Sequence, residues 1–302
     1  MTGQASIHAH GLDEAAEQLA PYLQLRYVQL ERGAICFHGT ATRAGAVTAG
    51  QYGGSRNTVE CIDVARERTL VLVPKQGRAR LGTASLSRLQ AVIAHGPVQL
   101  VAFTDRDCQL MFASFPSPRS VIDVGVSRAS RARLFALSEA QQREFEDHVD
   151  GGDLQSCVAR FISSWTPHEH ASRSPVVTTA ARCHAAVRAR EFIDHHLDQR
   201  LSLASVCRAS YSSPRALEYG FQEIFGISPM AYVRCSRLSR VRRELYVAPP
   251  VNGIVTQLAM KWGFWHLSQF SKDYYELFRE LPSATLSRAN NHRDARELAQ
   301  FR

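Results

Sequence analysis

The sequence lacks the long apolar segment of a membrane-spanning protein. Although 45% of its 302 residues are hydrophobic, no apolar run reaches the roughly 18–20 residues that a spanning helix needs. The first residues, MTGQASIH, contain no basic stretch followed by an apolar core, so we expect no secretory signal. The composition predicts packed cores rather than disorder, and we expect a cytoplasmic protein with no membrane partner.

The sequence also has little that would build a metal or catalytic site. Its seven cysteines are odd in number, widely spaced and without a Cys-x-x-Cys pair, which favours reduced, buried thiols. His8 and His10 precede the first expected strand, whereas His38 and His95 stand alone. No nucleophile elbow or phosphate loop is present. We therefore expect no metal, no cofactor and no enzyme activity.

Basic residues are distributed unevenly along the chain. Residues 1–170 contain 17 Arg or Lys and 17 Asp or Glu, whereas residues 171–302 contain 19 and 11. The second part therefore carries the whole net charge of +8. A neutral part joined to a basic part is typical of a sensor domain fused to a DNA-binding module.

The N-terminal part has the pattern of short β-strands. Apolar and polar residues alternate from 23 to 115, after a short helix between 12 and 25. The expected strands are 23–30, 34–37, 58–62, 70–73, 91–94, 98–103 and 109–112. The expected turns contain Gly33, Gly50, Gly53, Gly54, Gly77, Gly82 and Gly96-Pro97. This spacing favours a small antiparallel sandwich or barrel.

Aromatic side chains are the expected filling of that barrel. The strand residues predicted to face its interior are Tyr27, Phe37, Tyr52, Phe103 and Phe112. They are candidates to line a ligand cavity, but plain core packing is the more usual role for each of them. The sequence identifies no effector-binding residue.

Helical spacing returns after Pro118. Ser138 predicts a helix cap, followed by helices over 141–149 and 154–164, which either form a dimer interface or pack on their own barrel. The polar segment 166–175 reads as a linker; it includes His168 and His170, whose spacing resembles metal ligands but which we interpret as exposed. A helix over 184–197 follows. The expected organisation is a 1–170 sensor domain, a 171–184 linker, a 185–289 DNA-binding domain and a 290–302 tail.

The last third of the chain contains one pattern twice. Residues 206–226 and 258–278 each read as a short apolar helix, a tight turn and a longer amphipathic helix. That is the outline of a helix-turn-helix, which places its second helix in the DNA major groove. Two such units predict a protein that reads two successive major-groove segments, roughly 34 Å apart.

Local signals define the ends of these helices. Ser212 or Ser213 caps the first long helix, Pro214 suits its first turn and Gly226 ends it. The expected core positions of the two long helices are Leu217, Phe221, Phe225, Phe264, Leu267, Phe270 and Tyr274. A connecting helix from Ser228-Pro229 to about Leu245 should hold both units in register. It carries Arg234, Arg237, Arg240, Arg242 and Arg243.

These motifs resemble the DNA-binding domain of the AraC/XylS family of bacterial transcription regulators. The matching segments are GISPMAY (226–232), RL (237–238), GFWHLSQFSK (263–272) and LPS (281–283). The resemblance covers residues 185–289 and implies a seven-helix domain with two recognition helices and an activator role. The chain departs from the family at Ser210 and Arg279, where the family has glycine, and at Lys272, where it has arginine. Lysine keeps the positive charge but lacks the planar guanidinium group that forms two hydrogen bonds to guanine.

The resemblance places outward-facing residues of both recognition helices against base edges or the adjacent backbone. The expected DNA-contacting residues are Ser213, Arg215, Glu218, Tyr219 and Gln222 in the first unit and His266, Ser268, Gln269 and Lys272 in the second. Phosphate contacts are expected from Arg234, Arg240 and Lys261. For each residue the alternative is a solvated helix face that never touches a base.

The fold class expected is thus an α+β multidomain protein, with a β-rich cupin-like barrel plus helices followed by an all-α double helix-turn-helix domain. The resemblance implies a regulator that binds double-stranded DNA, responds to a small-molecule effector, forms a homodimer and contacts RNA polymerase. Two alternatives stay open. One is a cupin-type enzyme that carries a DNA-binding domain; the other is a regulator whose N-terminal domain mediates only protein contacts.

Overall fold

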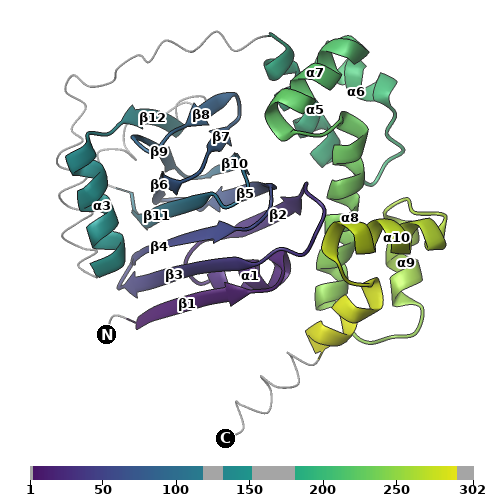
Figure 1. The fold of residues 1–302 in the computed structure, drawn as a ribbon, viewed down its shortest axis with the longest axis horizontal. Helices are drawn as coiled ribbons and strands as arrows, with labels where there is room; N and C mark the ends of the chain where they lie inside the picture. Colours follow the sequence, from purple (N-terminus) through teal and green to yellow (C-terminus); the bar gives the residue numbers. More distant parts are fainter. Residues whose placement is uncertain (1–2, 118–131, 152–180, 291–302) are drawn as a thin grey trace, which may run out of the picture. The chain divides into compact units, whose positions relative to one another are not determined.

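The computed structural model describes residues 3–117, 132–151 and 181–290 (Figure 1). It divides the chain into two compact units. The first comprises Met1–Tyr27 and Cys36–Thr179, and the second comprises Val28–Ile35 and Ala180–Arg302. The first unit is β-rich and the second is helical, as the sequence predicted. The expected helix at 154–164, the linker at 166–175 and the His168/His170 pair lie outside the described residues.

The first unit is built from two antiparallel sheets and two described helices. The larger sheet has the strand order β1-β3-β4-β11-β6-β9-β12 and the smaller has β2-β5-β10-β7-β8. The strands are β1 (Gly3–Ala9), β2 (Leu25–Gln29), β3 (Phe37–Ala44), β4 (Val47–Gly54), β5 (Thr58–Val64), β6 (Arg68–Gln76), β7 (Ala79–Leu81), β8 (Ala84–Leu86), β9 (Gln90–His95), β10 (Val98–Thr104), β11 (Gln109–Pro116) and β12 (Ala132–Ala136). The helices are α1 (Leu12–Leu19) and α3 (Glu139–Gly151).

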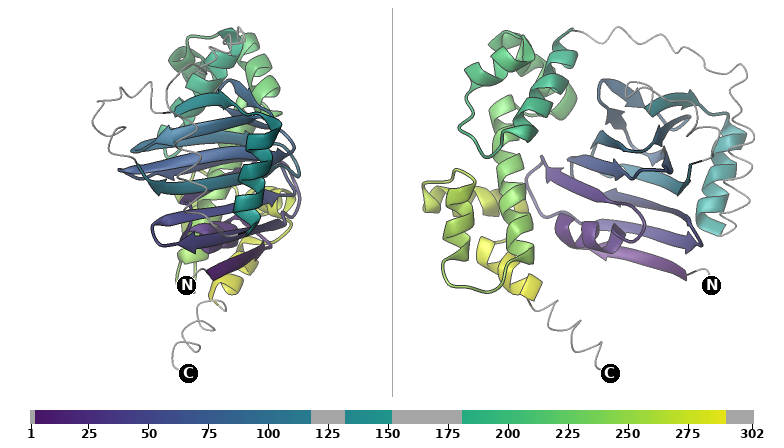
Figure 2. Two further views of the ribbon diagram at one scale, coloured as in Figure 1. Left: turned by 90° about the vertical axis from the view of Figure 1, so that its left-hand side faces the viewer. Right: turned by 180° about the vertical axis from the view of Figure 1, so that it is seen from behind.

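The central strands of the larger sheet, β4, β6 and β11, are buried on both faces. Met111 and Ala113 of β11 face α3, where Phe145 and Val149 pack against them in one apolar cluster. Figure 2 shows α3 lying across the strands of this sheet. The alternate residue of β11, Phe112, packs near Tyr52 with ring centroids 6.1 Å apart. Because side chains alternate along a strand, this second face forms the core between the two sheets. Phe145 and Val149 thus pack on their own sheet.

Three expectations for this unit need correction. Gly50, Gly53 and Gly54 were expected in turns, but they lie inside β4. A Cβ on Gly50 would approach the Thr40 carbonyl oxygen of the neighbouring strand to 2.2 Å, so glycine permits this close pairing. The strand at 34–37 begins only at Phe37, as β3. In addition, His8 lies within β1 rather than before the first strand.

The predicted interior residues are confirmed as core. The aromatic side chains of Tyr27, Phe37, Tyr52, Phe103 and Phe112 are all buried. Tyr27 meets Phe37 edge-on at 5.1 Å between centroids, and Phe37 stacks with Tyr52 at 6.0 Å. Aromatic pairs in this range stabilise a core beyond the effect of area burial alone. They form a continuous aromatic row through the space between the sheets.

The second unit consists of helices, together with the short segment Val28–Ile35. The helices are α5 (Ala181–His195), α6 (Leu203–Ser210), α7 (Pro214–Phe225), α8 (Pro229–Val247), α9 (Ile254–Lys261), α10 (Leu267–Phe278) and a final described helical stretch at 282–290. Within this unit the Gln29 side-chain amide donates to the Leu277 carbonyl oxygen at 2.7 Å. Seven helical stretches thus lie in the part of this unit that the structure describes, as the resemblance implied.

Two further features concern the described residues alone. None of their helices is long and apolar enough to cross a membrane. Six of the seven cysteines lie among them, and all six are free thiols. Burial raises the pKa of the Cys108 thiol well above its usual range and that of Cys235 to about 12, which keeps both protonated and unreactive at neutral pH.

Candidate nucleic-acid interface

The first helix-turn-helix comprises α6 and α7, with well-formed caps. The Ser202 hydroxyl accepts from the Ser205 backbone N–H at 3.1 Å at the start of α6. Of the two predicted caps of α7, Ser213 is the one used: its Oγ accepts from the Ala216 backbone N–H at 3.3 Å. Pro214 occupies the first turn, and Gly226 ends the helix at φ 70°. A serine cap stabilises a helix by about 1 kcal/mol, so the sequence fixes both ends of α7.

The turn between α6 and α7 differs from the family pattern in a specific way. Ser210, where the family has glycine, is the last residue of α6; it is buried, and its hydroxyl donates to the Val206 carbonyl oxygen at 2.8 Å. The left-handed residue is the next one, Tyr211, with φ 53°. A side chain in this region costs roughly 1–2 kcal/mol. Tyr211 is also 89% exposed, so its ring lies on the surface beside the recognition helix.

One face of α7 is packed firmly against the rest of the unit. Leu217, Phe221 and Phe225 are buried, as predicted. Gly220 lies on the same side, where an added Cβ would come within 2.3 Å of the Arg182 carbonyl oxygen of α5. The backbones of α5 and α7 therefore approach closely, and this contact sets the orientation of α7.

The opposite face of α7 presents the predicted DNA-contacting residues. Ser213, Arg215, Tyr219 and Gln222 are exposed, and Glu218 is half-buried. The Arg215 guanidinium lies 5.7 Å from the centroid of the Tyr219 ring, so the two side chains form one exposed pair. Gln222 is partly engaged, because its amide donates to the Gly226 carbonyl oxygen at 3.1 Å.

The second helix-turn-helix comprises α9 and α10. Gly263 makes the turn at φ 82°, and the Phe264 backbone N–H then bonds the Ala259 carbonyl oxygen at 2.9 Å. Phe270 and Tyr274 are buried, as predicted, whereas Phe264 is only partly buried. Leu267 was expected to face inward, but it is 37% exposed. It is the first residue of α10, where the helix has not yet reached its packed neighbours.

The outer face of α10 carries the second predicted set. His266, Ser268, Gln269 and Lys272 are all exposed. Lys272 forms no ion pair with any residue that the structure describes. One exposed aromatic residue just before this helix was not among the predicted contact residues. Trp265 is 73% exposed, and the signal that could have identified it is a large aromatic in the turn that precedes a recognition helix.

The arginines of α8 are mostly engaged within the protein. Arg234 pairs with Asp273 of α10, and Arg237 donates through Nε to the Leu197 carbonyl oxygen at 3.0 Å. The side chain of Arg242 is only 4% exposed and pairs with Glu280. α8 therefore acts as the connecting helix that the sequence predicted, and its arginines reach helices on both sides.

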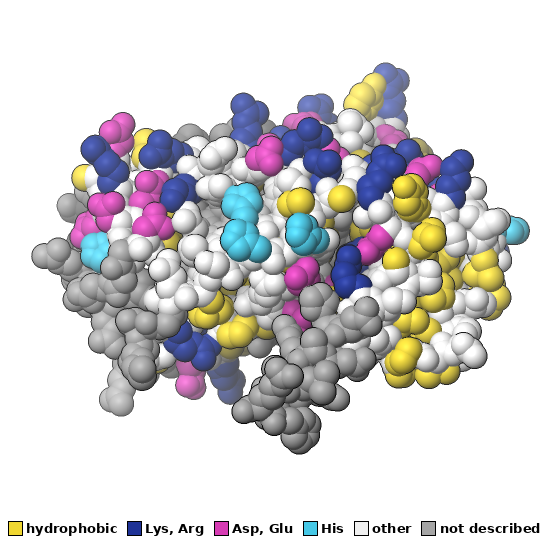
Figure 3. Space-filling view, turned by 60° about the horizontal axis from the view of Figure 1, so that its bottom comes forward, with side chains coloured by type: hydrophobic (Ala, Val, Ile, Leu, Met, Phe, Trp, Pro, Cys, Tyr) yellow, Lys and Arg dark blue, Asp and Glu magenta, His cyan; other side chains and the backbone are white. Residues whose placement is uncertain are grey.

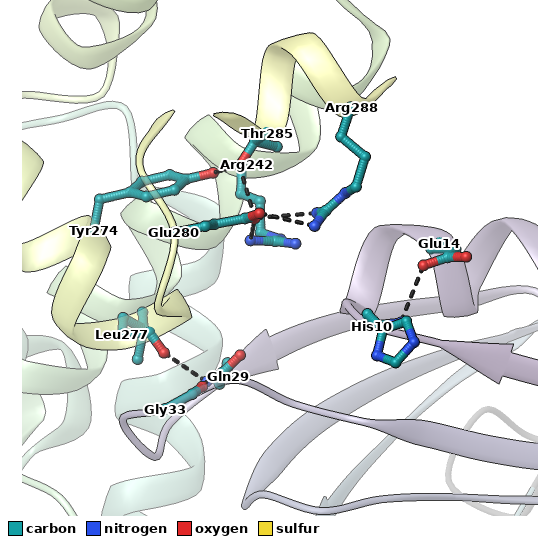
Figure 4. Close-up of polar contacts among 10 residues, drawn as sticks. All are labelled: His10, Glu14, Gln29, Gly33, Arg242, Tyr274, Leu277, Glu280, Thr285 and Arg288. Carbon is teal, nitrogen blue, oxygen red and sulfur yellow. Dashed lines mark hydrogen bonds and ion pairs between the residues drawn. The ribbon is translucent and has the colours of Figure 1, made fainter. Parts of the chain in front are cut away.

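Figure 4 shows how Glu280 organises the end of this unit. Its carboxylate forms ion pairs with Arg242 and Arg288 and accepts a hydrogen bond from the Thr285 hydroxyl. The Tyr274 hydroxyl is in turn hydrogen-bonded to Thr285 at 2.8 Å. Charge-assisted bonds of this kind stabilise a buried network only when all its members are satisfied. The network therefore fixes α8 against the helix that follows α10.

The remaining two predicted phosphate contacts lie at the junction of α8 and α9. Lys261 is exposed and pairs with Glu244 at 2.8 Å. The Arg240 guanidinium lies 5.9 Å from the centroid of the Trp262 ring. Trp262 is half-buried and donates through Nε1 to Glu244 at 3.1 Å. Both cations thus have defined positions, Lys261 at the surface and Arg240 half-buried.

Taken as a group, these contacts give one helical connector with a recognition helix at each end. α8 has 19 residues, which corresponds to roughly 28 Å at 1.5 Å per residue. α7 and α10 begin with exposed first turns, and helix N-termini attract phosphate through their free N–H groups. The arrangement can place two short, polar, partly aromatic helix faces against a nucleic acid.

The first unit contains histidines that also need an account. Strand pairing sets His8 directly opposite His38, so His38 is not isolated as the sequence suggested. Figure 3 shows a face on which histidine side chains lie close together. The Gln109 amide donates to His38 Nε2 at 3.0 Å, and within the described ranges no group of three His, Cys, Asp or Glu side chains could hold a metal ion.

A buried carboxylate lies between the two sheets. Glu60 accepts from the Tyr52 hydroxyl at 2.9 Å and from the Thr104 hydroxyl at 3.0 Å. Burial raises the pKa of Glu60 from 4.5 to about 7, although these hydrogen bonds oppose the shift. The Tyr27 hydroxyl is buried with no hydrogen-bond partner in the described part of the chain. Sequence reasoning missed Glu60, because a single Glu in an alternating strand reads as solvent-facing.

Comparison with known proteins identifies relatives of the helical unit. Residues 206–288 match the family model described as a helix-turn-helix domain. The chain is 34% identical over 96 residues to the probable thc operon regulatory protein of Rhodococcus erythropolis, covering 32% of this chain and 29% of that protein. It is 36% identical over 102 residues to the XylDLEGF operon transcriptional activator 2 of Pseudomonas putida, covering 33% and 64%. The chain thus matches less than two thirds of the length of these relatives.

The chain is also similar to a solved structure. The chain is 32% identical to a probable AraC family transcriptional regulator from Rhodopseudomonas palustris, covering 35% of this chain and 96% of that one, with a TM-score of 0.33.

Proposed function

This chain belongs, through its C-terminal domain, to the AraC/XylS family of transcription regulators, and from that premise we propose that the whole protein is a sequence-specific DNA-binding regulator. Its two recognition helices, α7 and α10, enter successive major-groove segments. α8 keeps them in register, so one chain reads two segments on one face of the duplex.

The observation that carries this proposal is the pair of exposed faces on α7 and α10. Arg215 and Tyr219 are exposed on the first, and Gln269 and Lys272 on the second, whereas the opposite faces are buried. Arginine and lysine pair with guanine, and glutamine pairs with adenine. Such a set of donors on two exposed helix faces suits base reading better than any catalytic role.

The remaining parts of the protein are assigned by the same proposal. The β-rich unit is a cupin-like sensor that binds a small-molecule effector, and the protein acts in the cytoplasm as an activator. It forms a homodimer and contacts RNA polymerase at its target promoters. The aromatic core between the sheets and the two-unit division of the chain support a sensor joined to a DNA-binding module.

The proposal is tested by DNA binding of the full chain. Fluorescence anisotropy would compare the DNA upstream of its own gene with a scrambled duplex of equal composition, across a salt series. We expect tight binding to the upstream DNA and weaker binding to the scrambled duplex, each with a steep salt dependence. Equal affinity for both duplexes at every salt concentration would contradict sequence-specific regulation.

A further inference from the structure

The first unit contains a cavity of about 490 Å³ that lies at one end of the two sheets. Its wall comes from the loop after α1, the turn between β3 and β4, and the end of β5, and residues of β6 and β11 complete it. Cavities of this size hold small organic ligands. All of the lining residues belong to the first unit.

A lateral row of side chains forms the floor of this cavity. Strand register sets Arg43 opposite Thr48, Thr48 opposite Ser114, and Ser114 opposite Leu70. Directly paired residues on neighbouring antiparallel strands share one face of the sheet. The four side chains therefore run side by side across β3, β4, β11 and β6, and all four line the cavity.

Two guanidinium groups meet at this row. Arg68 donates through Nε to Ser114 Oγ at 3.0 Å and through Nη2 to the Ala46 carbonyl oxygen at 3.1 Å. Arg43 donates to the Pro21 carbonyl oxygen and lies 5.9 Å from the centroid of the Tyr22 ring. Backbone carbonyls, a hydroxyl and a ring thus hold both arginines in place within the cavity wall.

Neither arginine is neutralised by an acid among the residues that the structure describes. In the part of the chain that the structure describes, no carboxylate forms an ion pair with Arg43 or Arg68. The acid that lines the cavity, Asp63, is engaged elsewhere: it pairs with Arg26 at 3.1 Å and accepts from Gln99 at 2.7 Å. Burial, followed by the like charge of Arg43, lowers the pKa of Arg68. The two cations therefore repel each other across a hollow that an anion would fill.

We propose that this cavity is a binding site for a small organic carboxylate, held between Arg43 and Arg68. The arginine fork matches the two oxygens of a carboxylate, and Thr48 and Ser114 supply hydroxyls beside it. Leu23, Val64 and Leu70 offer apolar surface to the body of the ligand. The role of this cavity as an effector site rests on the proposed regulator function. Binding of a carboxylate in the cavity does not depend on that function.

The site is tested on the full-length protein without DNA. Isothermal titration and thermal unfolding would be measured with hexanoate and phenylacetate, with their uncharged amides, and with inorganic phosphate. We expect one site per chain for a carboxylate, a rise in melting temperature, and at least a tenfold weaker response to the matching amide. Arg43→Gln should remove at least 90% of the affinity, because it deletes the charge but leaves the strand intact.

The matched control is Arg78→Gln, an exposed arginine of the same unit that does not line the cavity; it should bind as the wild type does. The proposal is overturned if amides bind as well as carboxylates, if Arg43→Gln binds normally, if phosphate alone binds, or if no carboxylate binds at 20 mM. Promoter binding by the ligand-free protein is measured separately. Carboxylate binding without selective DNA binding would refute the regulator and keep the site, and the reverse result would refute only the site.

Discussion

Arg234 of α8 is ion-paired with Asp273 of α10, so the connector helix holds the second recognition helix directly by its middle. Asp273 is 9% exposed, and it also accepts from Gln269 at 2.8 Å, one turn earlier on α10. A residue expected to touch DNA, Gln269, is thus positioned by the same carboxylate. The buried Asp273 carboxylate therefore fixes the position of a side chain on the outer face of α10.

Replacing Arg234 tests whether its role lies inside the protein. Arg234→Met leaves the buried carboxylate of Asp273 with one partner fewer, which should lower the free energy of unfolding by about 1–2 kcal/mol. Because the guanidinium is already occupied, we expect the salt slope of DNA binding to stay unchanged. Chemical denaturation and a salt series measure the two quantities. Arg200→Met, at an exposed arginine with no partner in the described ranges, is the matched control. A slope reduced by about one would instead identify Arg234 as a phosphate contact.

Arg215 should read one base. Arg215→Ala removes the charged member of the exposed Arg215–Tyr219 pair. We expect a loss of about 1–3 kcal/mol on the preferred DNA site, confined to one base position, with little change on random DNA. Anisotropy on a set of single-base variants of the site measures this. An equal loss on specific and random DNA would show that Arg215 contacts only the backbone.

How far the sequence determines these features varies with how local they are. The caps Ser213 and Ser228 and the stop at Gly226 act within one helical turn, so α7 and α8 could be predicted to within two residues. The pairing of Arg242 with Glu280 joins residues 38 positions apart. Nothing in the periodicity of α8 indicates it, and Arg242 therefore reads as a surface residue.

The β-rich unit shows the same limit more strongly. β4 contains Gly50, Gly53 and Gly54, which read as turn residues because glycine lowers strand propensity. Its pairing with β3 and β11 overrides that local preference. The row from Arg43 to Ser114 depends on the register of three strands, and no sequence pattern indicates that register. Such a site becomes visible only in the folded chain.

Glu60 should make the first unit less stable as the pH rises. Its pKa is about 7 in the folded protein, against 4.5 ordinarily, so between these values the folded state holds a proton that the unfolded state has released. Stability therefore falls as the pH rises from about 4.5 to 7, by up to about 3 kcal/mol at 1.36 kcal/mol per pKa unit. Circular dichroism melts at several pH values measure this decline.

The controls for Glu60 separate the buried carboxylate from the rest of the protein. Glu60→Gln should flatten the decline, because glutamine does not titrate. Glu139→Gln, at a side chain that is 77% exposed, should leave it unchanged. A Glu60→Gln variant with the full wild-type decline would place the responsible group elsewhere.

Arg279 offers a route to a more stable second unit. It ends α10 in the left-handed region with φ 58°, where its family has glycine. Glycine carries no side-chain penalty there, so Arg279→Gly should raise the free energy of unfolding by about 1 kcal/mol. Arg279→Ala removes the same charge but keeps the strain, and it should give no gain. Equal stability of the two variants in denaturant titrations would show that strain at this residue is negligible.

The central claim, that α7 and α10 together read two successive major-groove segments, is tested most directly by in vitro selection from random DNA. The full chain would be used, and the enriched duplexes sequenced. The account predicts two conserved segments whose centres lie about 10–10.5 base pairs apart. Arg215→Ala should reduce base conservation in only one segment, and Lys272→Ala should reduce it in only the other. A single conserved segment, or no enrichment over the starting pool, would contradict it.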